Sequence, residues 1–257
     1  MGTVSPAPRP SATVLLLRDA PGGGPLQVFL QRRVTGMAFA GGMTVFPGGG
    51  VDSGDRPDPS RWRGPGPEWW AQRFACSAEE AGALVVAAVR ETFEECGVLL
   101  ADPGPVDAAA RDDLAARSRT LPDVLATAGL TLCADLLLPW ARWVTPESEA
   151  RRYDTAFFVA RLPEGQNADA RTTEAVEATW WTPEEALEGG RRGALRLMPP
   201  THHTLQELAA YPATAAVMDA ARSRPVRTHR PVLDRDGGRL VVTDPDLPGL
   251  RFDLGPA

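Results

Sequence analysis

Two stretches near the start of the chain have the apolar pattern of β-strands. Residues 11–19 read SATVLLLRD and residues 26–34 read LQVFLQRRV, so both are dominated by Val and Leu. The six residues between them, APGGGP, contain three glycines and two prolines, which favour a turn. The pattern therefore predicts a β-hairpin at the beginning of the fold.

A long helix is predicted for residues 79–96, EEAGALVVAAVRETFEEC. Gly97 follows it, and glycine is the residue type that most often ends a helix. The apolar side chains recur at the three- and four-residue spacing of a buried stripe: Val86, Val89, Phe93 and Cys96. We therefore expect one face of this helix to pack on the core.

Later segments have shorter patterns. DAAARDDLAARSRT and LPDVLATAGL predict two short helices between residues 103 and 130, and RRYDTAFFVARLP at 151–163 predicts another strand. Near the end of the chain, Asp236, Gly237 and Gly238 favour a tight turn between two strands. The alternation of strands and helices predicts an α/β fold with a terminal β-hairpin.

Composition and charge narrow the possible functions. The chain has 257 residues, of which 43% are hydrophobic, so it can bury a substantial core. No membrane span or signal peptide is evident, which makes the cytoplasm the expected location and a membrane an unexpected partner. The net charge of −6 argues against a nucleic-acid-binding surface. Three cysteines without a CxxC spacing favour neither a disulfide framework nor a zinc site.

Negative charge is concentrated at the end of the long helix. Glu91 lies three and four residues before Glu94 and Glu95, so the three carboxylates share one side. They also lie where the helix dipole is already negative. Arg90 can offset one of these charges. The other two suit a hard divalent cation, which prefers oxygen ligands, although a solvated acidic helix end is an alternative.

A glycine-rich segment, VFPGGGVDSGD, precedes this helix. Together the two segments resemble the Nudix hydrolases, whose box reads G-x5-E-x7-R-E-U-x-E-E-x-G-U, where U is aliphatic. Residues 90–98 match the second half, with Thr92 at an aliphatic position. The first half matches Gly49 and Asp55, with aspartate in place of glutamate. Between Asp55 and Arg90 the chain has 34 residues where the pattern has seven, an insertion of 27.

The resemblance implies a Nudix-type α/β/α sandwich with a mixed sheet. It divides the chain into a Nudix hydrolase domain over residues 9–222 and a C-terminal β-hairpin extension over 223–257. The domain would carry one insertion within the box, residues 56–82, and a helical insertion at 103–130. The first insertion is rich in tryptophan and proline, which predicts an ordered loop. It could form a wall of the substrate cleft, a packing element or a homodimer contact.

The resemblance also implies a reaction, hydrolysis of a nucleoside diphosphate linked to another group with Mg²⁺ or Mn²⁺ as cofactor. By position in the box, the metal ligands would be Glu91, Glu94, Glu95 and the carbonyl of Gly48. Arg90 would orient Glu94, and Glu91 would position or deprotonate the attacking water.

The general base of this family varies and can lie on a distant loop. Here Glu174 and Glu177 are the candidates, with ordinary surface charge as the alternative for both.

The residues before the box indicate a substrate. GMTVFPGGGVD resembles the coenzyme A diphosphatase signature G-x-V-x-F-P-G-G-x-x-D, with Thr44 in place of valine. That subgroup implies coenzyme A or acyl-coenzyme A as the small-molecule nucleotide substrate. The predicted substrate-binding residues are Arg32, Arg33, Phe46 and Gly49. Two alternatives are a housecleaning hydrolase of oxidised nucleoside triphosphates or nucleotide sugars, and a non-catalytic Nudix module that binds a ligand.

Overall fold

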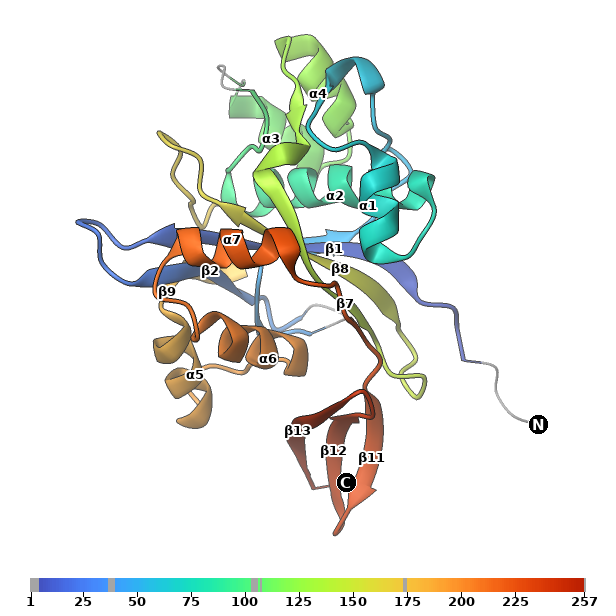
Figure 1. Ribbon diagram of the computed structural model, residues 1–257, viewed down its shortest axis with the longest axis vertical. Helices are drawn as coiled ribbons and strands as arrows, with labels where there is room; N and C mark the ends of the chain where they lie inside the picture. The colour runs from blue at the N-terminus through green and yellow to red at the C-terminus, as the bar shows by residue number, and fades with distance from the viewer. Residues whose placement is uncertain (1–4, 37–39, 103–105, 107, 173–174, 257) are drawn as a thin grey trace.

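A computed structural model describes residues 5–36, 40–102, 106, 108–172 and 175–256 (Figure 1). Its largest element is a mixed sheet in which strands follow the order β10-β7-β8-β1-β2-β3, with β4 beside β1 and β9 beside β2. The strands of this sheet are β1 (Arg9–Asp19), β2 (Leu26–Arg33), β3 (Thr44–Val45), β4 (Gly48–Gly50), β7 (Leu137–Val144), β8 (Tyr153–Arg161), β9 (Ala175–Trp181) and β10 (Thr228–His229).

Strand β1 is the centre of this sheet. It runs parallel to β8 along one edge, while its other edge pairs antiparallel first with β4 and then with β2. Strands β1 and β2 and the turn between them are the hairpin that the sequence predicts. Because β1 is shared, the glycine-rich strand β4 is held directly beside the middle of the sheet.

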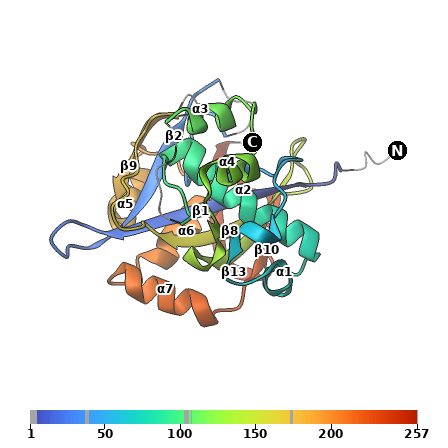
Figure 2. The same cartoon turned by 90° about the horizontal axis from the view of Figure 1, so that it is seen from above.

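Helices cover both faces of the sheet, as the α/β/α prediction requires. Helices α1 to α4 lie on one side, and α5 and α6 lie on the other (Figures 1 and 2). The side chains of β1 alternate between the two layers: Ala12, Val14 and Leu16 pack with α2, whereas Leu15 and Leu17 pack with α6 and α7. The helices are α1 (Pro67–Phe74), α2 (Ala78–Cys96), α3 (Ala108–Ala115), α4 (Leu121–Ala128), α5 (Pro183–Arg191), α6 (Pro199–Leu208) and α7 (Thr214–Ser223).

Helix α2 begins one residue before the predicted start. The Ser77 side chain accepts a hydrogen bond from the Glu80 N–H, and Gly97 ends the helix in the left-handed conformation, with φ 72°. The predicted apolar stripe is buried, and so are several polar side chains, because α1 and α3 also cover this helix. Thr92, at the aliphatic box position, donates a hydrogen bond from its hydroxyl to the Ala88 carbonyl at 2.7 Å. Its buried polar group therefore has a partner within the helix.

The insertion within the box is packed, as predicted, but much of it is helical and is not the predicted loop. It forms a short 3-10 helix (Pro59–Arg61), β5 (Trp62–Arg63), α1 and the first residues of α2. Trp70 is fully buried among aromatic rings of α1 and β8. The indole N–H groups of Trp62 and Trp70 both donate to the Pro65 carbonyl, at 2.9 and 3.1 Å. Strand β5 pairs with β6 (Leu132–Cys133), which leads through another 3-10 turn (Ala134–Leu136) into β7.

The predicted C-terminal extension has two more strands than the hairpin, because β10 joins the main sheet beside β7 and a third strand joins the hairpin. Strands β11 (Val232–Asp236) and β12 (Arg239–Asp244) form the predicted hairpin around Gly237 and Gly238, both with positive φ. Strand β13 (Leu247–Pro256) then pairs with β12. Its sequence LPGLRFDLGP argues against a strand, because proline and glycine weaken strand interiors, yet an edge strand tolerates them.

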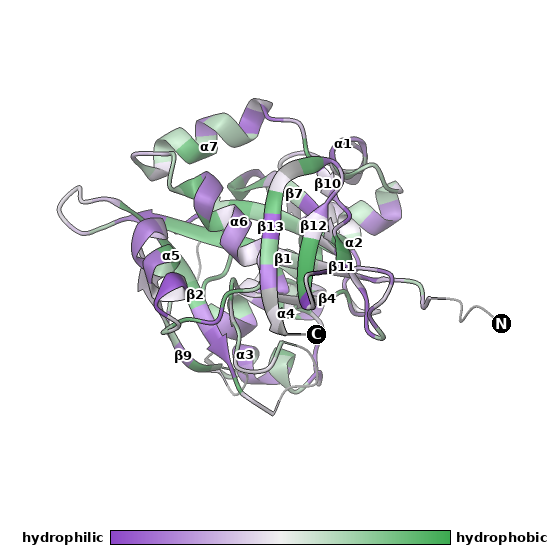
Figure 3. Ribbon diagram, turned by 90° about the horizontal axis from the view of Figure 1, so that it is seen from below, coloured by the Kyte–Doolittle hydropathy of each residue, from purple (hydrophilic) through white to green (hydrophobic). Residues whose placement is uncertain are grey.

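In Figure 3 the middle strand β12 is mostly hydrophobic, whereas the outer helix α5 is mostly hydrophilic.

All three histidines of the chain lie where this C-terminal sheet meets the domain. Nδ1 of His229 is 3.3 Å from Oδ2 of Asp244 on β12. The His203 ring is 5.5 Å from the His229 ring, and the His202 ring is 5.2 Å from that of Phe252 on β13. The junction is therefore built around titratable rings.

This junction should make the protein less stable in mild acid. Burial lowers the pKa of His229 and of His203 below the usual 6.5, although Asp244 and Glu207 oppose the shift. The unfolded state then binds protons first as pH falls, so stability is complete above about pH 6.5 and declines below it. We expect the free energy of unfolding in urea to be lower at pH 5.5 than at pH 7.5.

The variant His229→Gln provides the control for this prediction, because it keeps a polar side chain that does not titrate. Its unfolding free energy should fall less over the same pH interval. Equal pH dependence in the two proteins would show that His229 does not carry the effect.

Among the helices of the described residues, none combines the length and the apolar character that crossing a bilayer requires.

Candidate active site

Arg90 of α2 connects the glycine-rich loop to the acidic end of the helix. Its Nε and Nη2 donate to the two carboxylate oxygens of Asp55, each at 2.8 Å, and Nη2 also donates to the Gly50 carbonyl at 2.9 Å. Nη1 donates to Oε1 of Glu91 at 2.8 Å and of Glu94 at 3.3 Å. The planar guanidinium suits this arrangement, because its donors form a rigid fork. We call Asp55, Glu91 and Glu94 around Arg90 the carboxylate cluster.

The contact between Asp55 and Arg90 spans 35 positions of the chain. It confirms that Asp55 belongs with the second half of the box despite the insertion. An uninterrupted box would place its first glutamate at position 82, where this chain has Gly82. This glycine lies inside α2, and an added Cβ there would be 2.8 Å from Pro57. The two halves of the box are therefore separate in sequence and joined in space.

The carboxylate cluster carries more negative than positive charge. Burial opposes the charge on Arg90, but the hydrogen bond with Asp55 and the charges of Glu91, Asp55 and Glu94 raise its pKa well above the usual value. Burial raises the pKa of Glu94, and the nearby carboxylates of Asp55 and Asp52 raise it further, while Arg90 lowers it. Arg90 is a single positive charge among the three carboxylates of the cluster, so the remaining negative charge favours binding of an additional cation there.

Gly49 allows the loop to approach this cluster closely. A Cβ added to Gly49 would lie 2.3 Å from Oε1 of Glu91, well inside van der Waals contact. Gly48 is equally constrained, because its φ is 156° and an added Cβ would lie 2.4 Å from the Ala12 carbonyl of β1. The two glycines are required by close packing against the helix and the sheet, respectively.

Glu95 contacts the glycine that precedes Gly49 in the loop. It is buried, and its Oε2 accepts hydrogen bonds from the Gly48 N–H at 2.7 Å and from Nε2 of Gln31 at 2.5 Å. At about 100° per residue, Glu95 lies roughly 40° around the helix from Glu91, so the two side chains meet neighbouring glycines of the same loop. The structure therefore places the third glutamate of the predicted metal set at the same glycine-rich loop as Glu91.

The donor chemistry of the cluster fits a divalent metal ion. Glu91 and Glu94 offer hard oxygen ligands, and one or two carboxylates together with water and substrate phosphates are a usual Mg²⁺ site. In the part of the chain that the structure describes, no three His, Cys, Asp or Glu side chains are arranged to hold a metal. Glu95 and the Gly48 carbonyl stay predicted ligands.

Three other predicted polar residues, Arg32, Arg33 and Glu177, lie on the paired strands β2 and β9. Arg32 of β2 forms an exposed ion pair with Glu177 of β9, with Nη2 3.2 Å from Oε2. The candidate base Glu177 and the candidate substrate ligand Arg32 therefore contact each other. Arg33 ends the same strand, where its N–H donates to the Met43 carbonyl at 3.0 Å. Glu174, the other candidate base, lies outside the described residues.

Phe46 does not contact the carboxylate cluster. Its ring is buried and packs edge-to-face on Phe157, with centroids 6.4 Å apart, on the side of the sheet that α6 and α7 cover. This position gives Phe46 a packing role, in place of the substrate contact that the signature suggests.

Two polar residues at the site are not evident from the sequence. Arg111 of α3 donates Nε to the Glu94 carbonyl at 3.0 Å and Nη1 to Asp169 at 2.7 Å, so it caps the end of α2. Gln31 holds Glu95 from the middle of an apolar strand. A polar residue within such a strand is a signal for Gln31, whereas the contact of Arg111 depends on how a separate helix packs.

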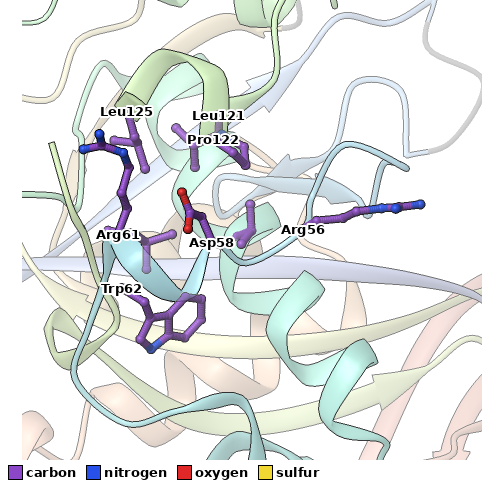
Figure 4. A pocket seen from close by; sticks show the side chains of 9 residues that line it. Arg56, Asp58, Arg61, Trp62, Leu121, Pro122 and Leu125 are labelled. Atoms are coloured by element: carbon purple, nitrogen blue, oxygen red, sulfur yellow. The ribbon is translucent and has the colours of Figure 1, made fainter. Parts of the chain in front are cut away.

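The two insertions contact each other over α2. Figure 4 shows Asp58, Arg61 and Trp62 of the first insertion facing Leu121 and Leu125 of α4 across a small pocket. Val86 of α2 and Leu132 of β6 complete the apolar lining. The insertions therefore form one continuous cap beside the box helix.

The chain belongs to the Nudix hydrolase family, because a sequence model of the NUDT19 Nudix domain matches residues 71–208. Members of this family generally use divalent metal cations. Among solved structures, a NUDIX hydrolase from Alicyclobacillus acidocaldarius is similar, with a TM-score of 0.71, 28% identity and coverage of 83% of this chain and 96% of that one.

Several relatives carry the name acyl-coenzyme A diphosphatase. The chain is 30% identical over 264 residues to the protein named acyl-coenzyme A diphosphatase NUDT19 from Gallus gallus, covering 78% of this chain and 68% of that protein. It is 25% identical over 226 residues to the protein of the same name from Xenopus laevis, covering 71% and 59%. The matched region spans 59 to 68% of the length of the relatives with this name, and 55% of a Caenorhabditis elegans relative named putative nudix hydrolase 7.

Proposed function

We propose that this protein is a metal-dependent diphosphatase that hydrolyses coenzyme A or acyl-coenzyme A. The observation that carries the proposal is the carboxylate cluster, in which Arg90 joins both halves of the split box and holds two glutamates at a glycine-rich loop. The similarity to proteins named acyl-coenzyme A diphosphatase supports the choice of substrate. Water would add to one phosphorus of the pyrophosphate, giving a 4′-phosphopantetheine product and adenosine 3′,5′-bisphosphate.

In this proposal the metal is Mg²⁺ or Mn²⁺, held by Glu91 and Glu94 with Glu95 and the Gly48 carbonyl as further ligands. When bound, it would neutralise charge on the pyrophosphate and polarise the attacking water. The protein supplies the rest. Arg90 orients both glutamates, Asp55 fixes Arg90 through two hydrogen bonds, and the buried position of these groups strengthens their electrostatic effects.

Glu174 is the predicted general base, and it would accept the proton that the attacking water loses. Glu177 is a weaker candidate for this role, because it is exposed and forms an ion pair with Arg32.

Product analysis tests this function directly. The protein is incubated with Mg²⁺ or Mn²⁺ and with coenzyme A, acetyl-coenzyme A, NADH, ADP-ribose and 8-oxo-dGTP, and the products are identified by mass spectrometry. Adenosine 3′,5′-bisphosphate is the expected product. Turnover of another compound alone would replace the proposed substrate, and turnover of none would favour a ligand-binding module.

The loop glycine gives a further test of the same site. In Gly49→Ala the new Cβ should displace the Glu91 carboxylate, which is the flexible partner in that contact. Misplacing a catalytic group in this way should lower kcat/KM by about tenfold on the substrate identified above. Gly50→Ala is the matched control, because a Cβ there has nothing within 4 Å. An equal loss in both variants would show that the approach to Glu91 is not the cause.

A further inference from the structure

Arg117 lies in the turn between α3 and α4 and faces the glycine-rich loop. Its Nε is 3.4 Å from Oδ2 of Asp52, and its side chain is 79% exposed. The same Asp52 oxygen is 4.0 Å from Nη2 of Arg90. The turn also meets the loop at Gly54, where an added Cβ would lie 2.6 Å from the Thr120 methyl group. Arg117 is therefore at the solvent edge of the carboxylate cluster.

The backbone of Arg117 has a conformation that favours glycine. Its φ is 55°, in the left-handed region. Its N–H donates to the Leu114 carbonyl at 2.8 Å, and the Ser118 N–H donates to the Asp113 carbonyl at 2.9 Å, which is how many helices end at a glycine. An arginine at this position destabilises the turn relative to glycine, and such strained residues often occur at functional sites.

We propose that Arg117 binds a phosphate group of the substrate, an inference that rests on the proposed diphosphatase function. The carboxylates of the cluster and Asp52 repel an anionic substrate, so binding needs cations besides the metal. A guanidinium forms bidentate hydrogen bonds with phosphate.

The present partner of Arg117 is easily exchanged for such a phosphate. The contact with Asp52 is exposed to solvent, and exposed ion pairs are weak. Arg32, the candidate from the sequence, is engaged with Glu177 on another part of the sheet.

The variant Arg117→Gly separates this role from a structural one. Glycine suits the left-handed turn, so the Tm should rise by about 1–3 °C. The loss of the guanidinium should raise KM about tenfold and leave kcat within about twofold, because binding of a non-reacting anion is removed. Arg117→Lys, which keeps the charge without the fork, should show an intermediate KM. An unchanged KM in Arg117→Gly would overturn the proposal.

Arg119→Ala is the matched control. It removes the same charge two residues further along the turn, where Arg119 bonds the Asp123 carbonyl and the Thr127 hydroxyl of α4. Its KM should equal that of the wild type. A rise in KM as large as that of Arg117→Gly would show a general effect of charge and would overturn a specific contact by Arg117.

Two substrates identify which phosphate is bound. Dephospho-coenzyme A lacks the 3′-phosphate of coenzyme A. If Arg117→Gly raises KM for coenzyme A alone, Arg117 contacts the 3′-phosphate, and if it raises KM for both, Arg117 contacts the pyrophosphate. Either result supports phosphate binding.

Calorimetry distinguishes failure of this inference from failure of the proposed function. Adenosine 3′,5′-bisphosphate and ADP are titrated into the wild-type protein and Arg117→Gly, with no turnover needed. Weaker binding of either nucleotide by the variant supports the inference even if the wild type hydrolyses no diphosphate. Equal affinities in the two proteins, or no binding by either, would overturn it.

Discussion

Replacement of Asp55 by alanine is expected to lower the free energy of unfolding by about 3–5 kcal/mol. The Asp55 side chain is 1% exposed and accepts two hydrogen bonds from Arg90, whose side chain is 8% exposed. Removing one partner of a buried ion pair leaves the other charge without compensation in a poorly solvated place. Urea denaturation of the two proteins at pH 7.5 measures this difference.

The control for this change is Asp102→Ala. Asp102 also forms an ion pair with an arginine, Arg63, but its side chain is 40% exposed and that of Arg63 is 48% exposed. An exposed pair contributes at most about 1 kcal/mol, so this variant should be nearly as stable as the wild type. A loss below about 1 kcal/mol in Asp55→Ala would mean that water reaches Arg90 and that the two halves of the box are not held by this pair.

The second large effect is expected for Glu95→Gln, which should lower turnover by two or more orders of magnitude. The change removes one negative charge from the predicted metal set but keeps the side-chain volume. It also keeps one oxygen that can accept from the Gly48 N–H or from Gln31, so the fold should persist. Circular dichroism melting and kcat on the substrate identified by product analysis test the two parts separately.

Glu79→Gln is the matched control, because Glu79 is an exposed residue in the first turn of the same helix. It should turn over substrate at the wild-type rate. Wild-type turnover in Glu95→Gln as well would remove Glu95 from the site and leave Glu91 and Glu94 as the remaining carboxylate ligands. A melted Glu95→Gln protein would instead assign Glu95 a purely structural role beside β4.

The elements of the fold that depend on local pattern could be predicted from the sequence. The β1–β2 hairpin, the bounds of α2 and the turn at Gly237 and Gly238 follow from residues close in the chain. Strand β13 could not be predicted, because its prolines and glycines conceal an edge strand that forms only by pairing with β12.

The residues of the site likewise fall into those that local sequence predicts and those that it does not. The side of α2 that carries Glu91 and Glu94 follows from helical spacing, and Asp55 follows from the box motif. The direction of Glu95 depends on Gln31 and Gly48, which are 64 and 47 positions away in sequence. Arg111 likewise reaches Glu94 from a separate helix. Spacing along one helix contains no information about such distant partners.

The insertion within the box has a consequence for how this chain can still change. Closing a connection of 34 residues instead of seven costs only about 1–2 kcal/mol of loop entropy, so an ancestral insertion at this place would have been tolerated. Now, however, Trp70 from the insertion is fully buried against Phe158 of the central sheet. Deleting the insertion would restore the short spacing and uncover an apolar face of the sheet. The longer connection is cheap in chain entropy, yet it is now part of the core, and the fold depends on it.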